Sequence, residues 1–253
     1  MFYSTKLKKF SNVSHCFFSR KNGHSKSIYQ SLNCGEGSGD SKDNIKKNLE
    51  HVAQKLELHR KDLILMNQTH SNKVIIVNST NKKIKKFKSD ALITNLKGFA
   101  LGVLTADCVP IILYDKKNEI IGCIHAGWKG CFSGIIENTL NKFREINAEN
   151  DIVACVGPCI GAQSYEVEVD FFHNFLKKSK ENSVFFIKKN KKKLLFDIRA
   201  FVNSKLNKLG VKNIDNIDMD TFKDQDNFFS YRRSKKLNES DYGRCISTIC
   251  LKT

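Results

Sequence analysis

Proline and tryptophan are scarce in this chain, with two prolines and one tryptophan in 253 residues. The scarcity of proline excludes a proline-rich linker, and no internal repeat is found. Hydrophobic residues make up 40% of the chain and charged residues 27%, a balance that is typical of globular proteins rather than disordered ones. We therefore expect a single domain over residues 1–253 with a sizeable buried core.

Long apolar runs are also absent. The first twenty residues interrupt their apolar side chains every few positions with Lys, Ser or Asn, and no run approaches the roughly 18 residues that a membrane span requires. The nine cysteines are odd in number, follow no disulfide framework and are preceded by no secretory signal. These absences predict reduced thiols in a cytoplasmic protein with no membrane partner.

Acidic residues are few relative to basic ones. There are 43 Lys and Arg against 26 Asp and Glu, which gives a formal charge of +17 and an attraction for polyanions or acidic ligands. Most of the excess is lysine in runs at residues 81–88, 176–180 and 187–193. The runs lack the interleaved aromatics and arginines of a base-stacking surface. Solvated loops without a nucleic-acid partner are therefore expected, with a basic polyanion-binding protein kept as an alternative.

Hydrophobic periodicity predicts an α+β fold. Residues 40–58 place Ile45, Leu49, Val52 and Leu56 at helical spacing behind a capping Asp or Ser. Short β-rich runs follow, and then helices alternate with strands, which favours a sandwich of mixed β-sheet with flanking helices. The expected strands are 63–70, 73–79, 90–95, 99–105, 109–115, 119–126, 151–157 and 245–251, and the further helices are 130–146, 166–178 and 197–210, the last with Asp197 as N-cap and Gly210 as C′ glycine.

Three residues at predicted strand ends could bind a metal. His70 lies in NQTHS, Cys108 in TADCVP and His125 in IHAGW. Two imidazoles and one thiolate suit zinc, and three protein ligands leave a fourth position for water, as in catalytic zinc sites. Their wide spacing matches no compact metal motif, however, and an isolated strand-end histidine is more often structural, so the spacing alone leaves both interpretations open.

The segment IHAGWKG, residues 124–130, crowds two glycines around the only tryptophan. Gly127 and Gly130 predict a sharp strand-to-helix turn whose free N–H groups, together with Lys129, could face an anion. A tight turn with Trp128 as core packing explains the same residues. The motif by itself does not distinguish these alternatives.

Taken in order, several motifs resemble one family. They are SRKNGHS, SLNCG, NQTH, DALIT, TADCVPIILYD, IHAGWKG, VGPCIGAQSYEV and FFSYRR. This order is similar to that of the YfiH-type proteins, once called multicopper polyphenol oxidases or laccase-domain proteins and now regarded as zinc-dependent purine nucleoside enzymes. The resemblance covers nearly the whole chain and implies a YfiH-like fold.

The resemblance also implies a site and an activity. The family's zinc ligands fall on His70, Cys108 and His125, with copper as the alternative metal. The implied reactions are phosphorolysis of adenosine, inosine, guanosine and methylthioadenosine, with inorganic phosphate as co-substrate, and deamination of adenosine. By this resemblance, Arg20 would contact phosphate or the substrate, and Asn33 would belong to the same pocket.

The chain departs from the family pattern at three positions. Asn22 stands where Gly is usual, Ser71 follows His70 where Gly is common, and Asp220 precedes Thr221 where Cys is common. Asn tolerates the left-handed conformation, so the first change is mild. None of the three removes an expected metal ligand.

Chemistry assigns further roles. For deamination, the metal would activate water for attack at C6 of the purine, and Asp107 is the candidate acid/base, with turn capping as its alternative. For phosphorolysis, Arg20, Lys129 and the Gly127 turn would stabilise phosphate and the leaving purine. A copper-dependent polyphenol oxidase is the alternative activity, but its centres need more histidines than seven scattered ones supply. The oligomeric state is left open.

Overall fold

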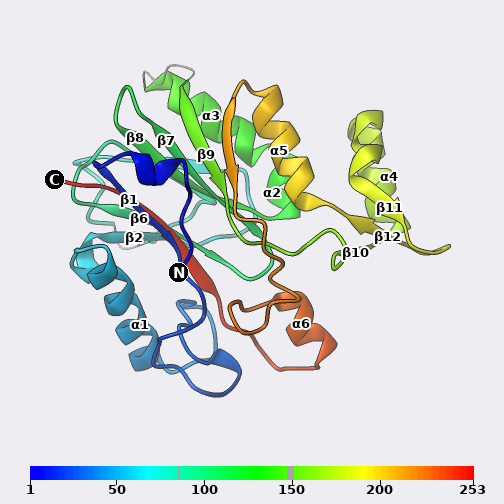
Figure 1. Cartoon of the computed structure of the whole chain (residues 1–253), viewed down its shortest axis with the longest axis horizontal. Helices are drawn as coiled ribbons and strands as arrows, with labels where there is room; N and C mark the ends of the chain where they lie inside the picture. Colours follow the sequence, from blue (N-terminus) through cyan, green and yellow to red (C-terminus); the bar gives the residue numbers. More distant parts are fainter. Residues whose placement is uncertain (85, 147–150) are drawn as a thin grey trace.

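Two β-sheets form the body of the computed structural model, which describes residues 1–84, 86–146 and 151–253 (Figure 1). Their strands are β1 (Val13–Phe17), β2 (Leu63–Met66), β3 (Val74–Val77), β4 (Lys86–Phe87), β5 (Ala91–Thr94), β6 (Ala100–Thr105), β7 (Val109–Asp115), β8 (Ile120–Ala126), β9 (Ile152–Val156), β13 (Asn213–Asn216) and β14 (Cys245–Leu251). One sheet has the order β1-β14-β6-β2-β4 and the other β13-β9-β7-β8-β5-β3. Both contain parallel and antiparallel pairs, so the predicted α+β sandwich of mixed sheet is confirmed.

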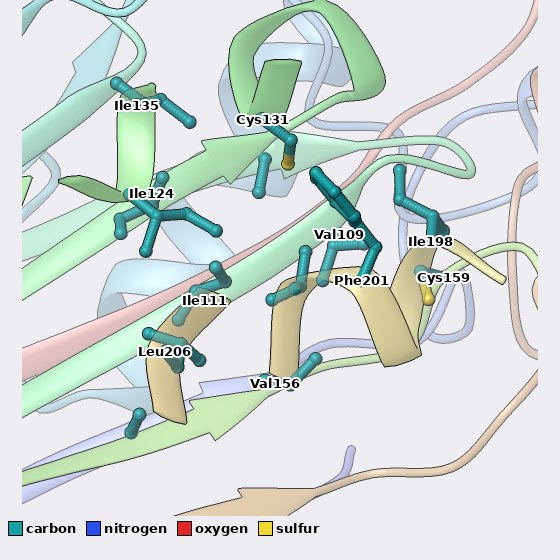
Figure 2. Packing of buried hydrophobic residues seen from close by; sticks show 14 of the residues in the cluster. Val109, Ile111, Ile124, Cys131, Ile135, Val156, Cys159, Ile198, Phe201 and Leu206 are labelled. Carbon is teal, nitrogen blue, oxygen red and sulfur yellow. The ribbon is translucent and has the colours of Figure 1, made fainter. Parts of the chain in front are cut away.

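Helices cover both outer faces of the sandwich. The α-helices of the described residues are α1 (Lys42–Lys55), α2 (Trp128–Ser133), α3 (Ile135–Glu145), α4 (Val169–Lys178), α5 (Ile198–Lys208) and α6 (Tyr231–Lys236), and four of them form these outer layers. The apolar stripe of α1 packs on the five-stranded sheet, and α2, α3 and α5 pack on the six-stranded sheet (Figures 1 and 2). No helix within the described residues is both long and apolar enough to cross a bilayer.

The central strand β7 is buried along its whole length because it lies between a helical layer and the other sheet. Ile111 and Leu113 point to the helices (Figure 2 labels the first), whereas Ile112 and Tyr114 point into the space between the sheets. A strand covered on both faces needs a continuous apolar sequence. The run VPIILYD satisfies this requirement and fixes the position of the residue that precedes it, Cys108.

A smaller unit extends to the right in Figure 1. It contains α4 and a three-stranded sheet of order β10-β12-β11, with β10 at Glu166–Glu168, β11 at Phe186–Lys188 and β12 at Lys193–Phe196. Its aromatic rings pack on α5 through contacts such as Phe175 to Phe201, with ring centroids 5.3 Å apart. The lysine run 187–193 therefore lies on an exposed β-hairpin and not in a plain loop.

Two predicted helices differ from the structure. The helix expected over 130–146 is broken at Gly134, whose φ of 96° is left-handed and separates α2 from α3. The helix expected from residue 166 begins at Val169, because the three preceding residues pair with β12. The other two helices are confirmed, and Asp197 caps α5 by accepting a hydrogen bond from the Ala200 N–H. The expected cap of α1 is not formed, because its N-cap residue Ser41 makes no side-chain capping hydrogen bond. All nine cysteines are unpaired, as expected.

Candidate metal centre

The β7–β8 hairpin holds two of the three candidate ligands. Cys108 immediately precedes β7, and His125 lies near the end of β8, directly opposite Pro110. Cross-strand pairing therefore brings the two side chains to the same end of the six-stranded sheet. His70 comes from the loop between β2 and β3, where its φ is 57°. The structure brings the three residues together, but His70 lies in a loop and not at the end of a strand over 63–70 as expected, because β2 ends at Met66.

The three ligand atoms form a compact group. One imidazole nitrogen of His70, one of His125 and the Cys108 Sγ all lie within 4.8 Å of one another. The Cys108 Sγ is 3.7 Å from His70 Nε2, and the two imidazole rings are 4.7 Å apart at an interplanar angle of 73°. His125 is buried, Cys108 is half-buried and His70 is exposed. The group is thus anchored in the core on one side and accessible to solvent on the other.

Asp90 is hydrogen-bonded to two of these three residues, His70 and His125. Its side chain is fully buried at the start of β5. One carboxylate oxygen accepts hydrogen bonds from the His70 N–H (3.0 Å) and from His125 Nδ1 (2.8 Å). The other accepts from the Thr69 N–H (3.2 Å), and from the Ser71 N–H and hydroxyl (2.7 and 2.6 Å). One carboxylate therefore holds the His70 loop and orients the His125 ring.

Asp90 is the first residue of the motif DALIT, but no role was predicted for it. The available signal is a charged residue placed directly before a buried apolar strand, where an unpaired carboxylate would be costly. Such a residue requires hydrogen-bond donors from elsewhere in the chain. Those donors come from a loop about twenty residues earlier and a strand about 35 residues later, which a local pattern does not reveal.

The electrostatics of the group favour ligand ionisation. Burial raises the pKa of the Cys108 thiol, but the neighbouring His125 and His70 imidazoles outweigh burial and lower this pKa to about 6. For His125, burial lowers the pKa, and the opposing effects of Cys108 and Asp90 raise it to about 9. The pKa of Asp90 is held below its usual range because hydrogen bonds from His125 and Ser71 outweigh burial. These shifts favour the thiolate form of Cys108, the form that binds metals, together with a protonated His125 that would lose its proton on binding a metal ion.

The residues present fit a metal ion. Since His125 Nδ1 is bonded to Asp90, its Nε2 is the nitrogen left for a ligand, and this carboxylate–histidine arrangement is the usual support of metal-binding histidines. Two imidazoles and a thiolate are suitable donors for zinc, and three ligands leave a tetrahedral position open. Within the described residues this is the one such group of three or more potential ligands.

Gly127 provides the space that the group needs. A Cβ at this position would lie 2.7 Å from His70 Cδ2 and 3.0 Å from the Cys108 Sγ. Its φ of −71° is open to any residue, so the expected sharp backbone turn is not what requires glycine here. Lys129, the neighbouring candidate, is exposed, with its ammonium 5.6 Å from the Trp128 ring centroid.

Asp107 faces away from solvent beside Cys108. Its carboxylate accepts hydrogen bonds from the Thr221 hydroxyl (2.7 Å), the Ser230 hydroxyl (2.9 Å) and the Arg232 N–H (2.6 Å). Burial raises the pKa of Asp107 and outweighs these bonds. The carboxyl thus fastens the segment before α6 to the metal-binding turn. Its acid/base role stays a prediction.

Arg20 lies apart from the metal-binding group. Its Nε donates to the Gln30 carbonyl (2.5 Å), its Nη1 donates to the Gln225 carbonyl (3.2 Å), and the guanidinium lies 4.3 Å from the Phe229 ring centroid. Together with Lys21 and Arg233 it lines a cavity of about 590 Å³ whose lining includes none of the three ligands. This cavity therefore contains Arg20 without any of the candidate metal ligands.

Asn33 is fully buried and uses its amide inside the chain. Its Nδ2 donates to Ser38 and Asp40, and its Oδ1 accepts from the N–H groups of Gly35 and Arg244. These four bonds organise the loop that follows the Arg20 segment. A direct contact between Asn33 and substrate stays a prediction.

The three departures from the family pattern have local explanations. Asn22 has a φ of 65°, the conformation that glycine adopts easily. Ser71 donates twice to Asp90. Asp220 accepts hydrogen bonds from the Gly161 N–H and the Ser164 hydroxyl, which ties its loop to the turn after β9.

Sequence comparison identifies similar proteins over most of the chain. A family model described as multi-copper polyphenol oxidoreductase laccase matches residues 14–252. A purine nucleoside phosphorylase, RC0672 of Rickettsia conorii, is 40% identical over 192 residues, which are 76% of this chain and 79% of that protein. The purine nucleoside phosphorylase YfiH of Escherichia coli is 32% identical over 239 residues, 94% of each chain.

Solved structures show the same fold. Neisseria meningitidis protein NMB0706 superposes with a TM-score of 0.85 at 30% identity and covers 96% of each chain. The Bacillus licheniformis protein YfiH superposes with a TM-score of 0.88 at 26% identity, over 95% of this chain and 93% of that one. The similarity therefore extends over both sheets and their flanking helices.

Proposed function

Because the chain belongs to the multi-copper polyphenol oxidoreductase laccase family, with relatives named purine nucleoside phosphorylase, we propose that it is a zinc-dependent purine nucleoside phosphorylase. Its proposed substrates are adenosine, inosine, guanosine and methylthioadenosine with inorganic phosphate. We further propose that it deaminates adenosine. The observation that carries the proposal is the group of His70, Cys108 and His125 supported by Asp90.

Zinc is preferred to copper because of the donor set. Blue-copper and trinuclear copper centres together require many histidines, whereas the described residues bring together two histidines and one cysteine. When bound, zinc would act as a Lewis acid and lower the pKa of a water at its open position. His70, Cys108 and His125 would hold the ion, and Asp90 would keep the His125 ring oriented.

The chain's own residues would position the substrates. Arg20 and Lys129 supply cationic donors for phosphate, and guanidinium groups bind phosphate in a fixed geometry. Gly127 is proposed to present its backbone N–H to the substrate, and the absence of a side chain there leaves space for the His70 ring and the Cys108 Sγ. The buried carboxyl of Asp107, whose pKa is raised, is the group proposed to hold or release a proton at its Oδ atoms.

Product analysis tests the proposal. Purified protein of known metal content is incubated with adenosine, with and without phosphate. Adenine and ribose 1-phosphate in the phosphate arm identify phosphorolysis, and inosine in either arm identifies deamination. Conversion of neither kind by zinc-loaded protein would contradict the proposed function.

Two variants locate the chemistry. Cys108→Ala should lose most of the metal and all activity, because removing one of three ligands leaves too few donors. Cys250→Ala, a buried thiol on β14, serves as the matched control and should retain both.

Arg20→Ala should impair phosphorolysis much more than deamination, since guanidinium pairs with phosphate. Equal losses in both reactions would assign Arg20 a purely structural role.

A further inference from the structure

A second cavity, of about 880 Å³, lies between α1 and the edge of the five-stranded sheet. Residues at the start of β2, such as Leu63 and Ile64, line it, whereas His70 follows the end of that strand. Neither the metal ligands nor Arg20 are among its lining residues. We call this cavity the α1–β4 groove; nothing proposed above uses it.

The floor of the α1–β4 groove is aliphatic. Ile45 and Leu49 of α1 and Leu63 and Ile64 of β2 line it and belong largely to the buried core. Ile84 on the opposite wall is 49% exposed. An apolar side chain that is half open to solvent beside an apolar floor is a surface that an apolar ligand would cover.

The rim of the groove is basic. Of the fifteen described residues that line it, seven are Lys or Arg and two are acidic. Lys42 and Lys46 lie on the α1 side, and Lys83 and Lys86 lie on the opposite side. The acid Glu36 is already paired with Lys86, at 3.4 Å, and with Arg60. The rim therefore keeps a positive excess on both sides of the apolar floor.

The described residues that line the groove are of two kinds only, charged and apolar. None is Asn, Gln, Ser, Thr, Tyr or His, the side chains that usually recognise the polar edges of a base or sugar. Its one aromatic, Phe99, already has the Lys82 ammonium 4.9 Å from its ring centroid. This lining does not favour a nucleoside or nucleotide.

From the aliphatic floor and the basic rim we propose that the α1–β4 groove binds an aliphatic anion, a molecule with an unbranched alkyl chain and a carboxylate or phosphate head. The alkyl chain of the ligand would lie on Ile45, Leu49 and Ile84, and its anionic head group would pair with lysines of the rim. The volume of the groove is within the range of small-molecule sites. This inference does not depend on the nucleoside chemistry proposed above.

Calorimetric titration of the full chain with dodecanoate tests the proposal, with octanoate, decanoate, dodecyl phosphate and dodecanol as comparisons, all below their micellar concentrations. Affinity should rise about fourfold for each added methylene that the groove buries. Dodecanoate and dodecyl phosphate should both bind, and the stronger of the two identifies the head group. Dodecanol should bind at least tenfold more weakly because it carries no charge.

Matched variants place the binding in the groove. Ile84→Asp and the double variant Lys46→Glu with Lys83→Glu should each weaken dodecanoate binding at least tenfold. Two control variants in the smaller unit should leave dodecanoate binding unchanged. They are Val184→Asp, at a residue that is 76% exposed, and the double variant Lys191→Glu with Lys192→Glu on the β-hairpin. The circular dichroism spectrum and the thermal unfolding midpoint should be the same in all four proteins, which shows that they are folded.

Three results would overturn the proposal. The first is equal loss of binding in groove and control variants, and the second is equal affinity for dodecanol and dodecanoate. The third is binding to vesicles that contain phosphatidylglycerol without binding of monomeric dodecanoate. That last result would assign the basic rim to a membrane surface instead.

Discussion

Asp90 connects the two histidines that the sequence places far apart. It accepts hydrogen bonds from the His70 N–H and from His125 Nδ1 and so fixes both segments, although it is not itself one of the three candidate metal ligands. Supporting carboxylates of this kind are worth a factor of ten to a hundred in metal affinity. Asp90 is therefore proposed as a positioning residue for the candidate metal centre.

Asp90→Asn should raise the zinc dissociation constant about ten- to hundredfold, because a neutral amide stabilises the His125 N–H less and reorients the ring. Competition with a chromophoric chelator measures this constant. Asp115→Asn is the matched control, since Asp115 is also fully buried and lies at the other end of β7. Equal zinc affinities in the two variants would show that the carboxylate does not support the site.

Gly127 makes a second prediction at the same scale. In Gly127→Ala the new methyl group would press on His70 and on the Cys108 Sγ, so we expect a folded protein with reduced zinc content and little activity. Gly37→Ala, where a Cβ meets nothing within 4 Å, should behave like the original chain. Full zinc occupancy in Gly127→Ala would mean that the ligands yield easily to the added carbon.

The candidate metal ligands could be predicted from the sequence, but the residues that hold them in place through hydrogen bonds could not. His70, Cys108 and His125 follow from strand-end positions and metal-binding chemistry combined with the family resemblance. Asp90 and the bonds of Asn33 and Asp107 depend on donors from distant segments. Long-range hydrogen bonds leave no periodic pattern in a sequence, so their partners emerge only from the folded chain.

Strand β1 illustrates how an element joins distant parts of the molecule. Its His15 accepts a hydrogen bond at Nε2 from the Ser4 N–H (2.8 Å) and therefore must be neutral there. Burial, followed by the nearby Lys8 charge, lowers the pKa of His15 to about 4. In the unfolded chain the ordinary pKa of histidine is about 6.5.

This difference predicts a loss of stability in acid. The unfolded state binds a proton at His15 that the folded state refuses, so the free energy of unfolding should fall as the pH drops from about 6.5 to about 4, by roughly 3 kcal/mol in total. Urea denaturation at several pH values measures it. His15→Gln should show a flatter dependence in this window, and an unchanged slope would exclude His15 as the cause.

At the level of elements, regular apolar patterns were predictable and short polar elements were not. The spacing of α1 and α5 and the apolar runs of β5 to β9 predict these elements correctly. β4 has two residues, and β13 has the polar sequence NIDN. Neither strand therefore shows the alternation of apolar and polar residues that predicts a strand. Their strand conformation depends on pairing with β2 and β9, which is a tertiary effect.

At the scale of the whole molecule, the two sheets place the candidate metal centre and the α1–β4 groove at opposite ends of β2. The strand lies between Asp62, which lines the groove, and the loop that carries His70. The net charge of +17 is concentrated partly on the exposed hairpin at 187–193 and partly on the groove rim. Acidic small molecules are thus attracted to more than one face.

The position of β14 sets the order in which the protein can fold. The strand lies between β1 and β6, and Val13 pairs with Leu251, so the last strand of the chain completes a sheet whose other members are synthesised much earlier. Sheets with such long sequence separations fold slowly. Until β14 arrives, β1 and β6 both present unpaired edges that invite aggregation. We therefore expect truncation before Cys245 to yield insoluble protein, although all of the candidate metal ligands are still present. We also expect refolding of the whole chain to be slow and to require a chaperone or low protein concentration for full recovery.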